Sequence, residues 1–405
     1  MKILQVCNKT PYPLKDGGAM AIHNMAVGLG ESGHEIHILA MHTRKHRSDE
    51  SKIVNYFKKR ENISVELVSI DTNPNIISLI LNFVFSRIPY NASRFISKKF
   101  ETRLEELLVN ENYDIVQFEG LYLAPYCNTV RKYSKALLVL RAHNVEHEIW
   151  QRHTVEIKNL FKRIYLRNLS KRVERFEKKT LNRYDVLIPI TERDKRKFLQ
   201  MGFGNKVYVC SYGISNDKRE QTTIPDKSSL NKLYFIGSLD WLPNQEGLKW
   251  FIRYIWPQIQ NENTNVTFSV AGRNAPEKFV RYLLDNNVDY HGEVDDPAAF
   301  IKGKIIMIAP LFSGGGVRVK IVEAMAAGRT VITTSMGAEG LDASDSKHLI
   351  IADDALKFSS DLRKLLSDFD YCLQIGKNAA KFVKNHLDNK LLISGLLDFY
   401  KSNAL

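Results

Sequence analysis

The residues best suited to chemistry stand in one string, PLFSGGGVRVKIVEAMAAGRTVITT, at positions 310–334. Three successive glycines at 314–316 allow tight turns and a close approach of the backbone to a ligand. A helical pattern follows from about 317 to 327, and Gly328 is placed to end it. A glycine-rich loop that opens a helix directs backbone N–H groups and the positive end of the helix dipole at an anion. The string therefore predicts a phosphate-binding loop.

Two cations, Arg318 and Lys320, fall in the first turn of this helix. Cations there oppose the helix dipole, so they do not serve helix stability, but they suit a bound diphosphate. Glu323 lies one turn further and can accept hydrogen bonds from ribose hydroxyls. The alternative is a mobile glycine loop with a surface Lys320–Glu323 pair at i, i+3 spacing. The combination of loop, cations, glutamate and small-residue helix favours phosphate binding.

Polar residues also follow two expected strands in the first half of the chain. His143 follows such a strand in LRAHNVEHEIW, and Glu119 follows the strand IVQF. Side chains at the carboxyl ends of parallel strands line the ligand crevice of open α/β sheets. A histidine that is hydrogen-bonded within its loop is the more common case in general, and a structural role for Glu119 stays equally open.

The elements that must position these residues form two series of alternating strands and helices. The expected strands of the first series are at 3–7, 35–40, 65–70, 115–118, 136–141 and 186–190, and those of the second are at 233–239, 266–272, 288–292, 305–311 and 330–334. Expected helices include 19–32, 95–110, 158–183, 361–366 and 379–386. Strand–helix–strand units of this kind build parallel, doubly wound sheets.

The chain of 405 residues is too long for one compact core. A polar stretch, SNDKREQTTIPDKSS, marks a linker at 216–231 between domains at 1–215 and 232–405. We expect two Rossmann-like α/β domains that face a central cleft, to which both domains would offer the loops at the carboxyl ends of their strands. The final helix can pack back on the first domain.

The amino-acid composition narrows the cellular location and the kinds of partner. Four widely spaced cysteines show no metal-ligand or redox spacing, and no apolar run is long enough to cross a bilayer or to serve as a signal peptide. We therefore expect a cytoplasmic chain. The net charge is +13, and it is one-sided: residues 1–215 carry 35 Lys/Arg against 22 Asp/Glu, whereas residues 216–405 carry 23 of each. Nucleic acid, an anionic membrane face or an anionic acceptor would each explain this excess.

Two segments favour the membrane. Residues 158–183 carry ten Lys/Arg and only two acids, and residues 75–99 are first apolar and then basic. Together they can hold the first domain on anionic lipid at the inner face of the cell membrane. The alternative for each segment alone is a solvated basic face of a core helix. We find no DNA- or RNA-binding motif and expect no nucleic-acid partner.

The string at 310–334 resembles the donor-site motif of GT-B glycosyltransferases, in particular glycosyltransferase family 4, the "group 1" transferases. Further segments resemble the family in its order along nearly the whole chain: Asp16-Gly17-Gly18 with GHEIHIL, LRAHNVEHEIW, FIGSLDWLPNQEGLKWF, VAGRNAP and YHGEVDD. The similarity is greatest to a subgroup that is frequent in bacterial surface-polysaccharide pathways.

This resemblance implies a retaining transfer from a nucleotide-diphosphate sugar to a sugar or glycolipid acceptor, without a cofactor or a bound metal. Arg318 and Lys320 would hold the diphosphate leaving group, Glu323 would hold the ribose, and His143 would stand beside the reaction centre. The remaining substrate-binding residues would be Gly17, Gly18, Glu119, Gly237, Asn244, Arg273, Gly315 and Gly316.

Two departures from the family pattern concern the donor site. Gly315 stands where the common motif has its first glutamate, and Gly237 is followed by Ser238-Leu239-Asp240 where the family usually has an arginine and a lysine. The cations of the glycine loop are expected to replace them. Two other functions stay open at this point: a nucleotide-sugar epimerase of the same fold, and a non-catalytic protein that binds sugar nucleotides.

Overall fold

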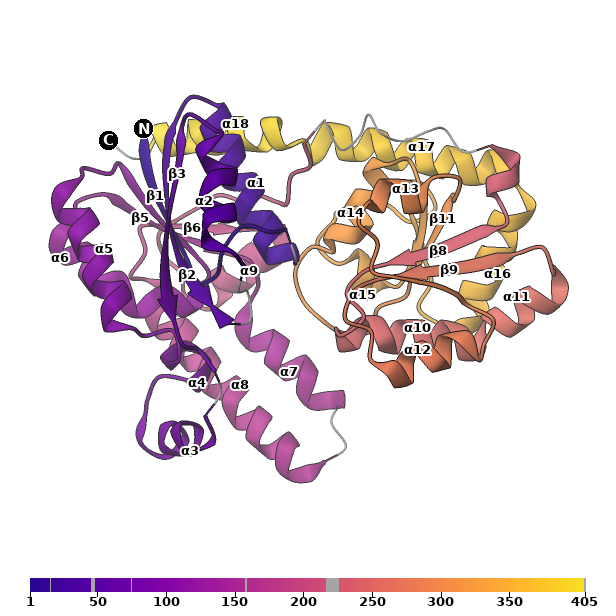
Figure 1. Cartoon of the computed structure of the whole chain (residues 1–405), viewed down its shortest axis with the longest axis horizontal. Coiled ribbons are helices and arrows are strands. Elements are labelled where there is room, and N and C mark those ends of the chain that lie inside the picture. Colours follow the sequence, from indigo (N-terminus) through magenta and orange to yellow (C-terminus); the bar gives the residue numbers. More distant parts are fainter. Residues whose placement is uncertain (15, 45–47, 74, 157–158, 216–225, 404–405) are drawn as a thin grey trace. The chain divides into compact units, whose positions relative to one another are not determined.

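The computed structural model describes residues 1–14, 16–44, 48–73, 75–156, 159–215 and 226–403 (Figure 1). The chain forms two compact units, Met1–Gly213 with Asn389–Leu405, and Ile214–Asp388. Most of the expected linker, residues 216–225, lies outside the described residues. Each unit is built around one parallel sheet with helices on both faces.

The first unit holds a seven-stranded sheet in the order β3-β2-β1-β4-β5-β6-β7. Its strands are β1 (Lys2–Cys7), β2 (Glu35–Thr43), β3 (Ile63–Ile70), β4 (Ile115–Glu119), β5 (Leu137–Ala142), β6 (Val186–Pro189) and β7 (Lys206–Val207). All neighbours pair in parallel. Because helices cover both faces, the central strands are continuous buried runs such as IVQFE in β4. The strand order reverses between β1 and β4, which makes their carboxyl ends the switch point of this sheet.

The helices of the first unit surround this sheet. They are α1 (Gly17–Glu31), α2 (Glu50–Lys58), α3 (Ile76–Phe85), α4 (Tyr90–Ser93), α5 (Lys98–Asn110), α6 (Cys127–Tyr133), α7 (Glu146–Glu156), α8 (Leu160–Leu181), α9 (Glu192–Gln200) and α18 (Asn389–Lys401), with a 3₁₀ turn η2 (Leu121–Tyr126) after β4. Helices α3, α7 and α8 extend beyond the end of the sheet (Figure 1). The C-terminal helix α18 packs on α1, where Asn389 Nδ2 donates to the Asn24 carbonyl at 3.0 Å.

The first helix begins earlier than the sequence pattern predicts. The Asp16 carboxylate accepts from Ala19 N at 2.9 Å and caps the helix, so Gly17 and Gly18 belong to the first turn of α1 and not to the preceding loop. At the other end, Gly33 has φ +82, and His34 N donates to the Leu29 carbonyl at 3.3 Å. Glycine ends this helix as expected because other residues rarely adopt that backbone conformation.

The second unit holds a six-stranded parallel sheet in the order β10-β9-β8-β11-β12-β13. Its strands are β8 (Lys232–Ile236), β9 (Thr267–Ala271), β10 (Asp289–Gly292), β11 (Ile306–Ala309), β12 (Thr330–Thr333) and β13 (Ile350–Ile351). Its helices are α10 (Leu242–Tyr254), α11 (Trp256–Glu262), α12 (Glu277–Leu284), α13 (Pro297–Ile301), α14 (Val319–Ala326), α15 (Ser335–Ala338), α16 (Ala355–Ser367) and α17 (Phe369–His386). The strand order reverses between β8 and β11.

The fold expected from the sequence, two doubly wound Rossmann-like sheets, is confirmed. The strands that the pattern missed are the two-residue edge strands β7 and β13, which are too short to show any periodicity. The expected basic helix at 158–183 is α8, and the helix expected from 95 is α5, which begins at Lys98 after the Ser97 cap. Among the described residues, no helix is long and apolar enough to span a membrane.

Candidate active site

The glycine-rich loop of the second unit follows β11 at the switch point of the sheet. Gly314 and Gly316 have φ of +106 and +70, a conformation that other residues adopt only under strain. The guanidinium of Arg318 donates to the carbonyls of Gly315 and Gly316 and lies 3.5 Å from the Met336 carbonyl. Arg318 is buried, and through these contacts it holds the loop in shape. The loop leads into α14, whose N-cap position is Arg318 itself, with no side-chain cap.

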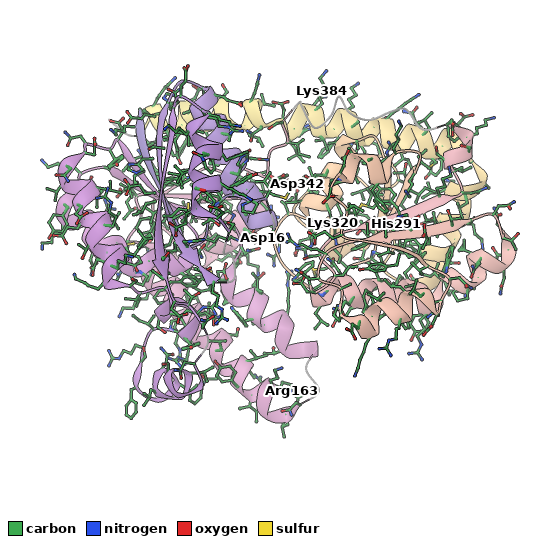
Figure 2. All side chains as sticks on the ribbon, in the orientation of Figure 1. Asp16, Arg163, His291, Lys320, Asp342 and Lys384 are labelled. Carbon is green, nitrogen blue, oxygen red and sulfur yellow. The ribbon has the colours of Figure 1, made fainter. Side chains whose placement is uncertain are left out.

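Lys320 is the cation that this loop presents at the start of α14 (Figure 2). Its ammonium group donates to Asn244 Oδ1 and lies 4.5 Å from the ring centre of Phe235 and 5.8 Å from that of Trp241. Among the described residues, no carboxylate forms an ion pair with it. Burial, and then the charge of Arg318, lower the pKa of Lys320 well below its usual value. A cation that is held by aromatic rings and an amide, without an anion, is a site prepared for an anionic ligand.

The loop after β8 supplies the other side of this site. Asn244 is buried near the start of α10, where its Nδ2 donates to the Ser238 carbonyl at 2.7 Å. The helix packs closely against the end of β11: a Cβ at Gly247 would stand only 1.7 Å from the Pro310 carbonyl oxygen. Glycine at this position thus permits the close packing that brings Asn244 to Lys320. Trp241 stays 36% exposed and lies beside Gly314.

The other predicted donor-site residues lie at the same edge of the second sheet. Gly237 follows β8, and its N–H donates to the Ala271 carbonyl at 3.1 Å. Arg273 follows β9, and its Nε lies 3.2 Å from Ser238 Oγ. Glu323 is partly buried one turn beyond Lys320 in α14. The structure thus gathers the predicted donor residues at the carboxyl ends of β8, β9 and β11, and their roles in binding stay predictions.

In the first unit, Glu119 is the centre of a buried polar cluster. It is 1% exposed at the end of β4 and accepts from Gln5 Nε2 and Gln117 Nε2, each at 2.6 Å. The Arg141 guanidinium lies 3.3 Å away, and His143 Nε2 lies 2.7 Å away. Burial alone would raise the pKa of Glu119, but Arg141 and His143 outweigh burial and hold this pKa at about 2. Glu119 is therefore ionised and fully engaged within the protein.

These contacts fix the state of His143. Burial lowers the pKa of His143 although the Glu119 carboxylate opposes this, so the ring is neutral at pH 7. An ionised carboxylate only accepts hydrogen bonds, so Nε2 carries the proton that is donated to Glu119. Nδ1 then carries the lone pair. The His143 side chain is 16% exposed, which leaves the ring in reach of a ligand. Glu119 thus fixes the tautomer and the orientation of the His143 ring, and its predicted contact with substrate stays a prediction.

The start of α1 holds the predicted Gly17 and Gly18 beside an ion pair. Lys9 Nζ lies 2.7 Å from the Asp16 carboxylate, and a Cβ at Gly18 would stand 2.4 Å from Lys9 Nζ. Glycine therefore leaves room for this pair at the helix start, where Figure 2 labels Asp16. The backbone N–H groups of the first helical turn also lie there.

Sequence reasoning missed Glu146 as a titrating group. It begins α7, three residues beyond His143, and burial, together with the nearby Glu177 carboxylate, raises its pKa to about 7. Glu177 is buried and accepts from Glu146 N at 3.1 Å and from His147 Nδ1 at 2.7 Å. Glu146 stands in the string HNVEHE, but its pKa depends on Glu177, which is 31 positions away. Among the described residues, no three His, Cys, Asp or Glu side chains are grouped so that they could hold a metal ion.

Several solved structures that resemble this fold are GT-B glycosyltransferases. The protein HepE of Anabaena, in complex with UDP, is similar with a TM-score of 0.70 at 14% identity, covering 99% of this chain and 100% of that one. Sucrose-phosphate synthase of Thermosynechococcus elongatus is similar with a TM-score of 0.71 at 13% identity, covering 99% of each chain. A mutant of TarM of S. aureus, in complex with fondaparinux, alpha-GlcNAc-glycerol and UDP, has a TM-score of 0.68 at 12% identity, covering 99% of this chain and 100% of that one. At such identities the likeness establishes the fold.

The family follows from the sequence comparisons. A family model described as Glycosyltransferase Family 4 matches residues 15–218, half of the chain, and one described as Glycosyl transferases group 1 matches residues 231–368. The chain belongs to glycosyltransferase family 4, and it is a glycosyltransferase. A relative from Klebsiella pneumoniae, an uncharacterized 44.6 kDa protein in the cps region, is 25% identical over 98% of both chains.

Proposed function

We propose that this enzyme transfers a sugar from a nucleotide-diphosphate sugar, with retention of configuration, to a sugar or lipid-linked acceptor. The observation that carries the proposal is Lys320. Its ammonium group stands at the switch point of the second sheet, against two aromatic rings and Asn244, beside a glycine loop, and without a carboxylate partner among the described residues. A diphosphate supplies the missing anion.

The same geometry supports catalysis of bond cleavage. Negative charge builds up on the diphosphate as its bond to the sugar breaks, and a preorganised cation stabilises that charge more than it stabilises the intact donor. Arg318 contributes indirectly, because it holds the carbonyls of Gly315 and Gly316 and so shapes the loop. Transfer without a bound metal is part of this proposal, because Lys320 takes the role that a divalent cation would otherwise play.

In the first unit we assign the acceptor side to His143. Its neutral ring, oriented by Glu119, offers Nδ1 as an acceptor to a sugar hydroxyl. A hydroxyl held in this way has a fixed orientation for attack on the donor. Gly17 and Gly18, at the start of α1, would offer backbone N–H groups to the donor phosphates and the reacting sugar.

A place in bacterial surface-polysaccharide synthesis is supported by the relative from the cps region of Klebsiella pneumoniae. The UDP in the HepE and TarM structures supports a nucleotide-diphosphate sugar as the donor. A lipid-linked acceptor would bring the enzyme into peripheral contact with the inner face of the cell membrane.

The test is thermal stabilisation of the purified protein by UDP, GDP, ADP, CMP and dTDP. A diphosphate present at about a hundredfold excess over its Kd stabilises the folded state by about 2.7 kcal/mol. We expect one nucleoside diphosphate to stabilise the protein, and we expect Lys320→Ala to weaken its binding by about tenfold or more, since a charge-assisted hydrogen bond is lost.

The matched control is Lys384→Ala, which removes an exposed lysine of α17 in the same unit (Figure 2). It should bind the diphosphate as the wild type does. Lys320 is a sharper target than Arg318, because loss of Arg318 would also release the loop carbonyls. Equal diphosphate binding by the wild type and by Lys320→Ala would show that the donor site is not at this loop.

A further inference from the structure

A groove in the first unit combines apolar walls with unpaired cations. It has a volume of about 690 Å³ and lies between α3, η2 and α8. Its apolar walls include Phe83, Ile88, Pro125 and Phe176. Five basic side chains line it as well: Arg87, Arg172, Arg175, Lys179 and Arg183. It is separate from the cluster of Glu119 and His143, whose residues are not among its lining.

One of these cations has a structural role. The Arg172 guanidinium donates to the Asn82 carbonyl at 3.0 Å and to the Ile88 carbonyl at 3.2 Å, and it lies 5.9 Å from the ring centre of Phe83. It therefore ties the end of α3 to α8. Burial lowers the pKa of Arg172.

The other four cations have no such use. Among the described residues, none of Arg87, Arg175, Lys179 and Arg183 forms an ion pair, and the first three are exposed. Both acids of α8 are already engaged: Glu174 pairs with Lys178 at 2.7 Å, and Glu177 is buried and binds His147. The groove thus concentrates positive charge without an internal counter-charge, and it is complementary to an anion such as a phosphate diester.

Exposed apolar side chains stand beside this groove. On α3, Phe85 is 80% exposed, and Leu81 and Phe83 are also exposed. On the first turns of α8, Leu160 and Ile164 are exposed as well. Figure 1 shows that α3 and the first turns of α8 both lie beyond the sheet, and Figure 2 shows Arg163 at that far end of α8.

Large apolar side chains that stand in water next to cations fit the interface of an anionic bilayer. We infer that α3 and α8 form a membrane-docking surface, in which the apolar side chains of α3 enter the headgroup region and the groove cations hold the phosphates of anionic phospholipids. The biological purpose of this surface rests on the proposed lipid-linked acceptor, but the binding of the surface to a membrane requires neither donor nor acceptor. A protein partner is less suited, because so many unpaired cations would each need a carboxylate in a matching place.

The experiment is co-sedimentation of the full chain with vesicles of phosphatidylcholine alone and of phosphatidylcholine mixed with phosphatidylglycerol. We expect binding to the mixed vesicles that is at least about tenfold stronger than binding to phosphatidylcholine alone, and that weakens as salt is added. Equal binding to both kinds of vesicle, or binding to neither, would overturn the inference.

The location of the surface is tested by charge reversal. Arg175→Glu with Lys179→Glu should weaken binding to the mixed vesicles by at least about tenfold. The control, Lys135→Glu with Lys206→Glu, makes the same change of net charge at exposed lysines beside the starts of β5 and β7, and it should bind as the wild type does. Equal losses in both double variants would show attraction by net charge alone and would refute a defined surface.

The apolar part is tested by Leu81→Ser with Phe85→Ser, which should also reduce vesicle binding, whereas the exposed pair Val109→Ser with Leu199→Ser should not. If a single-stranded RNA bound through Arg175 and Lys179 while the vesicles did not bind, the ligand of this surface would be nucleic acid, and the membrane inference would be overturned. Nucleotide binding by each variant is measured in parallel. Vesicle binding that fails while a diphosphate still binds through Lys320 would overturn this surface and leave the proposed function intact.

Discussion

At the residue scale, the site depends on pairs that the sequence indicates only in part. The glycine loop and Lys320 are contiguous in sequence, so their spacing alone predicted an anion site. The partners of Lys320 were not predictable in the same way, because Phe235, Trp241 and Asn244 are about 80 positions away. Phe235 comes close because β8 lies next to β11 in the sheet, and Asn244 because α10 packs on the end of β11. Likewise, His143 was visible as a candidate, but its neutral state follows from Glu119 and from burial.

Glu119 provides a test of the acceptor cluster. Its pKa of about 2 lies below the usual value of 4.5, so it contributes stability above about pH 4.5 that is lost as the pH falls towards 2. Glu119→Gln should lower the free energy of unfolding at pH 7 by about 3 kcal/mol, because Arg141 is left as a buried charge without its partner. Urea denaturation at pH 7 measures this loss. Glu111→Gln, which breaks only the exposed pair with Lys2, should cost much less, because exposed ion pairs contribute little to stability, and an equal loss in both variants would show that Glu119 does not hold the cluster together.

Glu146 should affect stability in the opposite direction. Its pKa is raised from 4.5 to about 7, so ionisation costs stability as the pH rises through that window, and the cost is complete above pH 7. Glu146→Gln resembles the protonated form. Relative to the wild type, the variant should gain about 2 kcal/mol in unfolding free energy between pH 5 and pH 8. A difference from the wild type that is the same at both pH values would show that Glu146 does not titrate in this range.

At the element scale, the strands and helices were largely predictable, but the approach of one element to another was not. Gly328 and Gly33 end their helices as their positions in the sequence predict. The start of α1 differs, because the Asp16 cap takes Gly17 and Gly18 into the helix. Gly247 lies in the middle of a helix, where glycine is unfavourable, and only the structure shows that Pro310 leaves no room for a side chain there.

Gly247→Ala tests this close approach. A Cβ there would stand 1.7 Å from the Pro310 carbonyl oxygen, so α10 must move away from the end of β11. We expect a loss of about 1–3 kcal/mol in unfolding free energy and weaker diphosphate binding, because Asn244 moves with α10. Gly204→Ala is the matched control, since a Cβ there meets nothing within 4 Å, and it should change stability by less than about 0.5 kcal/mol. Unchanged stability and binding in Gly247→Ala would mean that α10 does not position the site.

At the scale of the whole molecule, the two units divide the charge and the chemistry. The basic excess is confined to residues 1–215, and the groove between α3, η2 and α8 gathers part of it on one surface. The second unit has a balanced charge and holds the glycine loop, so its positive potential is local to Lys320 and the start of α14. Residue counts along the sequence revealed the charge imbalance. The concentration of charge in one groove could not be predicted from them, because it depends on how α3 and α8 pack in the folded chain.

Turnover of the nucleotide sugar decides whether Lys320 stabilises the leaving group. Release of nucleoside diphosphate, and of labelled product, is measured for the wild type, Lys320→Ala and Lys384→Ala, with the donor whose diphosphate stabilises the protein. We expect kcat to fall by about 10²–10³-fold in Lys320→Ala, as it does when a group that stabilises developing charge is lost, and to stay unchanged in Lys384→Ala. Undiminished turnover by Lys320→Ala would show that the leaving group is stabilised elsewhere and would refute the role given to this lysine.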